Sequence, residues 1–95
     1  MYTRVATYNM NPENENDVLA LLPSNKEKIS AVPGLISCHS YWRQDGQGCT
    51  VSVYDNKDSA EKAAEDVAEI WASLAPYLTA PPSVVEYENA ENMKN

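Results

Sequence analysis

A histidine and a tyrosine stand two residues apart in the middle of the chain, and both can exchange protons. His39 is the only histidine, and Tyr41 follows it in a stretch with the composition of a β-strand. Because side chains alternate along a strand, the two residues are expected on the same face. A histidine titrates near neutral pH and can act as a general base. The spacing predicts His39 and Tyr41 as catalytic residues; the alternative is an exposed strand histidine without a catalytic part.

Five further side chains are predicted to bind a small molecule. Arg4 and Arg43 carry guanidinium groups that can hold an acidic group of a substrate. Alternatively, they form surface ion pairs in this acidic chain. Tyr8 and Tyr54, together with Tyr41, are expected to line an aromatic pocket, or else to make contacts in a dimer. Ser52 is expected on the same face as His39 and is the fifth predicted binding residue.

No cofactor or metal signature accompanies these residues. The sequence contains no glycine-rich phosphate loop, no nucleophile elbow and no zinc-ligand spacing. The two cysteines, Cys38 and Cys49, are too few for a disulfide framework. We expect them as buried, inert thiols on the side of the sheet that the helices cover. The sequence therefore predicts neither a cofactor nor a metal ion.

Composition limits the partners. The chain has 95 residues and a net charge of −7, and its seven Lys and Arg residues are scattered. This leaves no basic face for nucleic acid or for an anionic membrane surface. There is no signal-peptide pattern and no apolar run near the ~18 residues of a membrane span. We expect one cytoplasmic domain, residues 1–95, with residues 89–95 as a polar tail.

The apolar pattern places these residues on strands and helices in the order βαββαβ. Pro23 is expected to kink or interrupt the first helix. Trp42 and Trp71 are expected in the core. The order predicts an α+β, ferredoxin-like fold, in which a four-stranded antiparallel sheet carries two helices on one face. The expected strands are residues 2–10, 35–43, 48–55 and 83–88. The first helix is expected over residues 12–32, and the second begins near Asn56 or Asp58 and ends at Leu74 or Leu78.

Asp45-Gly46 predicts a tight turn between the two middle strands. A two-residue turn and a four-residue loop give one register, which separates the two cysteines by roughly 13 Å along the ladder. That distance excludes an internal disulfide. The face predicted to lie beneath the helices carries Ile36, Cys38, Ser40, Trp42, Cys49, Val51 and Val53. The other face carries Ser37, His39, Tyr41, Arg43, Thr50, Ser52 and Tyr54.

Two helices cover only one face of such a sheet, so the other face meets water, a ligand or a second copy. Its aromatic and polar side chains suit a contact surface, and we expect a homodimer packed through it. The first strand leaves two sets open as the face beneath the helices. These are Tyr2, Arg4, Ala6 and Tyr8, or Thr3, Val5, Thr7 and Asn9.

Three segments carry a family resemblance: residues 4–13, the sequence Val32-Pro33-Gly34-Leu35, and residues 48–55 with a helix directly after them. With these segments the chain resembles the dimeric α+β barrel superfamily, and within it the antibiotic biosynthesis monooxygenase (ABM) domains. The resemblance covers about residues 2–88.

The resemblance implies cofactor-independent oxygenation of electron-rich aromatic molecules, haem degradation or a small isomerisation. The haem-degrading branch uses an Asn on the first strand, and a Trp and a His on the second helix. Ala6 and Ala63 occupy the Asn and Trp positions here, and the second helix has no His, so haem degradation is not supported.

We therefore predict a monooxygenase-like homodimer that binds a small hydrophobic or aromatic molecule in a cavity between sheet and helices. The substrate would supply the electrons, and the protein a dry, orienting pocket. The alternative is a non-catalytic dimeric binding or interaction module of the same fold.

Overall fold

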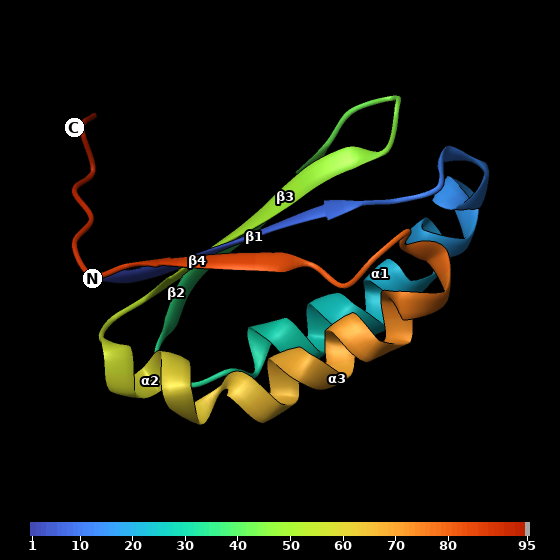
Figure 1. Cartoon of the computed structure of the whole chain (residues 1–95). Helices are drawn as coiled ribbons and strands as arrows, with labels where there is room; N and C mark the ends of the chain where they lie inside the picture. The colour runs from blue at the N-terminus through green and yellow to red at the C-terminus, as the bar shows by residue number, and fades with distance from the viewer. Residues whose placement is uncertain (95) are drawn as a thin grey trace.

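Four antiparallel strands form one sheet, and the helices lie on one of its faces (Figure 1). The computed structural model describes residues 1–94. The strands β1 (Tyr2–Asn9), β2 (Leu35–Trp42), β3 (Gln47–Tyr54) and β4 (Ser83–Tyr87) lie in the order β2-β3-β1-β4. Helices α1 (Glu15–Ser30) and α3 (Ala64–Leu74) pack against each other beneath the sheet. The other helical segments are η1 (Pro12–Asn14), α2 (Lys57–Lys62) and η2 (Ala75–Tyr77). This arrangement confirms the predicted ferredoxin-like α+β fold.

Helix α1 runs without a break through Pro23, so the predicted interruption does not occur. Pro23 removes one backbone donor from the helix. The apolar side chains of α1 lie on both sides of this position, and Leu22 and Ile29 both face the layer between helix and sheet. Packing of that face holds most of the stability of a helix in a folded protein, and here it outweighs the lost hydrogen bond.

The second helical region consists of two helices that meet at Ala63, where the sequence predicts one. Asn56 caps α2, because its Oδ1 accepts a hydrogen bond from Ser59 N at 2.9 Å. Ala60 and Ala63 are buried in one cluster with Tyr2 and Tyr54. The small alanine side chains therefore let α2 approach β1 and β3 closely.

No helix within residues 1–94 is long and apolar enough to cross a membrane.

The hairpin between β2 and β3 closes with a loop of odd length, residues 44–46, and not with the predicted two or four residues. Arg43 N donates to Gln47 O at 2.8 Å, and Gly46 N donates to Arg43 O at 3.0 Å. Gly46 takes the left-handed conformation, with φ 92°, which is common at the end of a three-residue hairpin loop. The odd length moves β3 by one residue relative to the prediction. A shift of one residue turns every β3 side chain to the opposite face.

The observed register overturns the predicted grouping of residues on the two faces. Ser52 lies opposite Cys38, and Thr50 lies opposite Ser40, on the side of the helices. His39 and Tyr41 lie on the other side, so placing them on one face with Ser52 and Tyr54 is wrong. The β2–β3 register pairs them with Val51 and Cys49 on this outer face.

The predicted face is wrong for one of the two cysteines, and neither thiol is fully buried as predicted. Cys38 lines the space beneath the helices, whereas Cys49 lies on the outer face opposite Tyr41. Both are half-buried free thiols. They remain unable to form an internal disulfide, because they point to opposite faces of the sheet.

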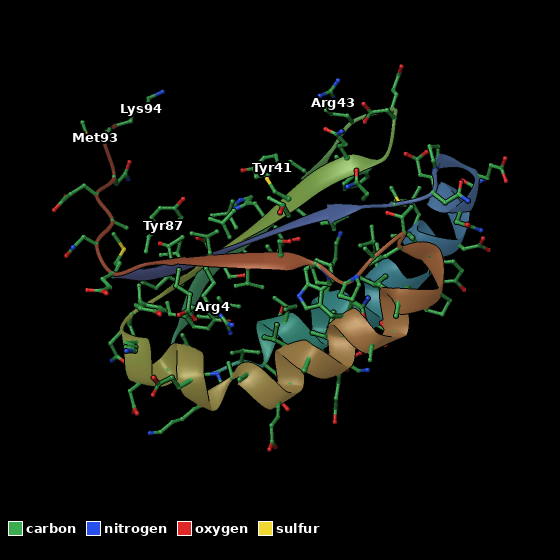
Figure 2. All side chains as sticks on the ribbon, viewed as in Figure 1. Arg4, Tyr41, Arg43, Tyr87, Met93 and Lys94 are labelled. Carbon is green, nitrogen blue, oxygen red and sulfur yellow. The ribbon has the colours of Figure 1, made fainter. Side chains whose placement is uncertain are left out.

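The structure settles which side of β1 lies beneath the helices. Tyr2 and Ala6 are buried there, and Arg4 and Tyr8 lie on the same face, because every second side chain of a strand points to the same side. Figure 2 shows Arg4 on the helix side of the sheet, while Tyr41 and Tyr87 project from the opposite side.

The two tryptophans are less buried than predicted. Trp42 is 40% exposed at the free edge of the sheet, so the prediction of a core residue is wrong for it. Trp71 is half-buried on α3. The most buried large side chain belongs to Tyr54, which is 1% exposed. Its cluster joins α2 to the sheet.

Candidate functional site

A cavity of about 540 Å³ separates the sheet from α1 and α3. Ligand pockets commonly have volumes of ~300–1,000 Å³. Its helix side is formed largely by aliphatic residues and Trp71, and its sheet side by short polar side chains and two aromatic rings. The sheet contributes Tyr8, Cys38, Ser40, Trp42, Thr50 and Ser52, and the helices contribute chiefly Val18, Leu19, Leu22, Ile29, Val67, Ile70, Trp71 and Leu74.

A row of hydroxyl groups crosses the sheet side of the cavity. Tyr8 Oη lies 3.0 Å from Ser40 Oγ, and Ser40 Oγ lies 3.0 Å from Thr50 Oγ1. Tyr8 Oη also donates to Tyr41 O over a longer distance, 3.4 Å. The row joins β1, β3 and β2, and it places hydrogen-bonding groups against an otherwise apolar space.

Gly48 makes the position of Tyr8 possible. The two residues are partners in the β1–β3 ladder. A Cβ atom at position 48 would lie 2.7 Å from Tyr8 Oη, which is closer than van der Waals contact. Because glycine has no side chain, the phenol ring of Tyr8 crosses β3 and reaches Ser40 on β2.

Tyr8 is held as a neutral phenol. Burial raises the pKa of Tyr8 above its ordinary value, and the hydrogen bond with Ser40 partly opposes this shift. Its ring also packs against Trp71, with ring centroids 5.6 Å apart and an angle of 57° between the planes. At neutral pH, Tyr8 therefore carries a proton that it can donate in a hydrogen bond, and it is not a general base.

A contact between sheet and helix borders the cavity. Trp42 Nε1 donates to Glu15 Oε2 at 2.9 Å, and both residues line the cavity. The contact joins the free edge of β2 to the first turn of α1.

A second chamber, of about 290 Å³, lies between the sheet and α3. It shares Thr50, Ser52, Val67 and Trp71 with the main cavity. The polar residues that line this chamber and not the main cavity are Arg4 and Tyr54. Arg4 comes from β1, and Tyr54 comes from the end of β3.

Arg4 contacts its neighbour on β4. Its Nε lies 3.0 Å from Glu86 Oε1, but the two atoms do not form a hydrogen bond. The Arg4 side chain is 27% exposed, whereas that of Glu86 is 48% exposed. The positive charge therefore lies deeper in the protein than its partner.

Tyr54 lies near this charge. Burial raises the pKa of Tyr54, and the positive charge of Arg4 partly opposes the shift. Like Tyr8, it remains a neutral phenol at neutral pH. On the same side of the sheet, Cys38 Sγ lies 3.5 Å from Ser52 Oγ.

The structure brings together four of the seven residues predicted for the site. Tyr8 and Ser52 line the main cavity, and Arg4, Ser52 and Tyr54 line the second chamber.

The other three predicted residues lie outside both chambers. His39 and Tyr41 stack on the outer face, with ring centroids 6.2 Å apart. Arg43 lies beside the hairpin loop, where its Nη2 is 3.3 Å from Asp45 Oδ2 and its side chain is 72% exposed.

Sequence reasoning missed Ser40, Thr50 and Trp71 as lining residues. The helical spacing of Trp71 indicates an interior position, but it does not indicate that the residue lines a cavity. Ser40 and Thr50 are ladder partners. Only the correct loop length between β2 and β3 would have placed them together.

The family model of the antibiotic biosynthesis monooxygenases matches residues 1–64, from β1 to the beginning of α3. This match spans more than half of the chain. The chain belongs to the antibiotic biosynthesis monooxygenase (ABM) family. A sequence search of curated proteins finds no match.

Solved structures with the same fold include several ABM proteins. A conserved protein from Methanosarcina mazei has a TM-score of 0.80 at 17% identity, over 94% of this chain and 92% of that chain. A Mycobacterium tuberculosis protein has a TM-score of 0.75 at 17% identity, over 98% of each chain. A monooxygenase from Streptomyces coelicolor, solved with the ligand nanaomycin D, has a TM-score of 0.75 at 20% identity, over 99% and 91%. At these identities the similarity establishes the ABM fold alone.

Within residues 1–94, the His, Cys, Asp and Glu side chains form no group of three or more that could hold a metal ion. The titratable groups that line the main cavity are Tyr8, Glu15, Lys26 and Cys38.

Proposed function

We propose that this ABM protein oxygenates a small, electron-rich aromatic molecule in the cavity between the sheet and helices α1 and α3, without a cofactor. The observation that carries the proposal is the cavity itself, which combines aliphatic walls with one row of hydroxyl groups. Such a space suits a flat apolar molecule that carries an oxygen atom. Membership of the ABM family supports the choice of chemistry, although a fold by itself does not determine activity.

The proposed reaction balances without an external reductant. A methylene group between two aromatic rings, as in an anthrone, loses two hydrogen atoms and becomes a carbonyl group. One atom of O2 enters that carbonyl, and the other leaves as water with both hydrogens. The substrate carbon supplies all four electrons. The reaction begins when the substrate, before it enters the cavity, loses a proton to water or buffer and becomes an electron-rich anion with the negative charge on an oxygen.

The protein's part in this reaction is to stabilise that anion and to exclude water. The hydroxyl group of Tyr8 donates a hydrogen bond to the oxygen of the substrate anion, after giving up its long contact with Tyr41 O. Trp71 covers the ring of Tyr8 and offers a second aromatic surface for the substrate. The aliphatic residues of α1 and α3 keep water away and strengthen the hydrogen bond.

We also propose that the protein forms a homodimer through the outer face of the sheet. No helix of residues 1–94 covers this face (Figure 1). Tyr41, Val85 and Tyr87 are 57%, 52% and 52% exposed on it. On the same face, the half-buried Val5 of β1 lies between Val85 of β4 and the half-buried Val51 of β3. Exposed apolar groups of this extent mark interaction surfaces. The stacked pair of His39 and Tyr41 then belongs to the dimer contact and not to the catalytic chemistry.

Oxygen uptake tests the proposed activity. The purified protein is mixed with anthrone in air-saturated buffer, and the rate is compared with the spontaneous oxidation of anthrone alone. The proposal predicts saturable, protein-dependent uptake of one O2 per anthrone, with one oxygen atom from labelled O2 in the product. Saturable binding of anthrone without faster uptake would favour the alternative, a non-catalytic binding module. The absence of both anthrone binding and protein-dependent oxygen uptake would overturn the proposal.

A further inference from the structure

The second chamber holds one cationic side chain among its lining residues, Arg4. The rest of its lining is apolar or neutral, and Tyr54 is the other large polar residue. A guanidinium group in a space of low polarity is costly unless it is paired with a negative charge. The pairing of Arg4 therefore indicates what the chamber can accept.

The contact with Glu86 leaves Arg4 only partly satisfied. A guanidinium group has five N–H donors in a fork that matches a carboxylate. Arg4 Nε is buried, and it lies 3.0 Å from Glu86 Oε1 without a well-directed hydrogen bond. Glu86 is nearly half exposed and is not among the lining residues of the chamber. The carboxylate therefore sits at the rim, and the charge of Arg4 faces the chamber.

The two chambers together suit one elongated molecule. Thr50, Ser52, Val67 and Trp71 line both, so the spaces adjoin. Arg4 and Tyr8 point to the same side of β1 and are four residues apart, which corresponds to roughly 13 Å along the strand. Three fused rings that carry a carboxylate are shorter than this distance, and the long side chain of Arg4 can reach across the remainder.

We propose that Arg4 forms an anion-binding subsite, and that the natural ligand is a polycyclic aromatic acid. Its carboxylate binds Arg4 in the second chamber, and its aromatic body extends past Trp71 toward Tyr8. This inference rests on the proposed function, because it names the class of molecule that the same cavity takes. Glu86 moves outward when the ligand binds, since it competes for the same guanidinium group. The competing explanation is a purely structural ion pair between neighbouring strands.

Two probes of equal shape separate these explanations. Anthracene-2-carboxylic acid is anionic at neutral pH, and anthracene-2-carboxamide is its neutral counterpart. Binding of each is measured by fluorescence titration to the wild-type protein and to three variants. Arg4→Met removes the cation, Glu86→Gln removes the competing carboxylate and keeps Arg4, and Arg43→Met removes an exposed arginine beside the hairpin loop. Circular dichroism and thermal unfolding establish that each variant is folded.

The proposal predicts that wild-type protein prefers the acid. Arg4→Met should weaken binding of the acid by about 10- to 100-fold, the usual strength of a charge-assisted hydrogen bond expressed as affinity. The same variant should leave binding of the carboxamide within about threefold of wild type. Glu86→Gln should tighten binding of the acid, and Arg43→Met should change neither. The Glu86→Gln result stands even when Arg4→Met does not fold.

Other results overturn the inference in distinguishable ways. Equal binding of both probes to wild type and to Glu86→Gln would mean that Arg4 is only a structural partner, while the cavity and the proposed function remain. Weaker binding of the acid by Glu86→Gln would contradict the proposed competition. If neither probe binds the wild-type protein, the proposed function fails and the subsite fails with it.

Discussion

The residues around Tyr8 define its chemical role. Its hydroxyl group has two partners on β2, Ser40 Oγ and Tyr41 O. Its ring lies over Gly48 on β3 and against Trp71 on α3. Burial raises the pKa of this phenol, so it remains a hydrogen-bond donor across the physiological range. It is suited to stabilise an oxyanion, and the substrate must therefore be acidic enough to lose its proton to water or buffer.

Replacement of Tyr8 by phenylalanine tests this role. We expect Tyr8→Phe to lower the rate of anthrone oxidation by about 10²- to 10³-fold, as for the loss of one oxyanion-stabilising donor. Anthrone binding should change little, because the ring remains. The measurement is oxygen uptake at saturating anthrone.

Tyr87→Phe is the matched control. It removes the same hydroxyl group from an exposed position on the opposite face, so oxygen uptake should remain at the wild-type rate. Equal loss of activity in both variants would contradict a specific role for Tyr8.

At the scale of single elements, the hairpin loop decides which side chains line the cavity. Gly46 ends this loop in a left-handed conformation. Its carbonyl accepts a hydrogen bond from Met10 N at 2.8 Å, and a Cβ atom at position 46 would collide with the carbonyl of Met10. The loop is thereby tied to the end of β1.

Gly46→Ala should destabilise the protein by about 1–3 kcal/mol. The left-handed conformation costs an alanine ~1–2 kcal/mol, and the collision with Met10 adds to that cost. Urea denaturation followed by circular dichroism measures the free energy of unfolding. Gln44→Ala, at an exposed position of the same loop, should change it by less than about 0.5 kcal/mol. Equal stability of the two variants would contradict the constraint on Gly46.

The sequence was sufficient for the elements and insufficient for their register. All four strands lie within two residues of their predicted bounds, because β-branched and aromatic residues alternate between clear stop signals. Asp45-Gly46 marked the turn, but two-, three- and four-residue loops all fit that pair. The choice between odd and even loop length decides to which face the side chains of β3 point. Here it places Ser52 and Thr50 on the helix side, where the prediction had Val51 and Cys49.

Local signals also failed where packing over a longer distance decides the structure. Pro23 is a valid stop signal in an isolated helix, but α1 continues because its apolar side chains face the sheet on both sides of that residue. The role of Tyr8 depends on Gly48, a residue forty positions away. No pattern in the sequence joins the two before the ladder is known.

At the scale of the whole molecule, one face of the sheet is covered and the other is open. The outer face carries Tyr41, Val85 and Tyr87, and Figure 2 shows Tyr41 and Tyr87 pointing away from the helices. We predict that the 10.5 kDa chain forms a dimer through this face. Sedimentation equilibrium at micromolar concentration should therefore give twice the chain mass.

Val85→Glu places a charge in the middle of the proposed contact and should shift the protein toward monomer. Glu65→Gln, at an exposed position on α3, should leave the dimer intact. A wild-type protein that sediments as a monomer would contradict the dimer without affecting the cavity.

The central claim is that an aromatic ligand binds between the sheet and helices α1 and α3. Nuclear Overhauser effects between a bound anthracene and the protein's methyl groups test it most directly. We predict contacts with Leu22, Val67 and Ile70, which line the cavity. Contacts with Val51 and Val85, on the outer face, would place the ligand on the opposite side of the sheet and contradict this binding site.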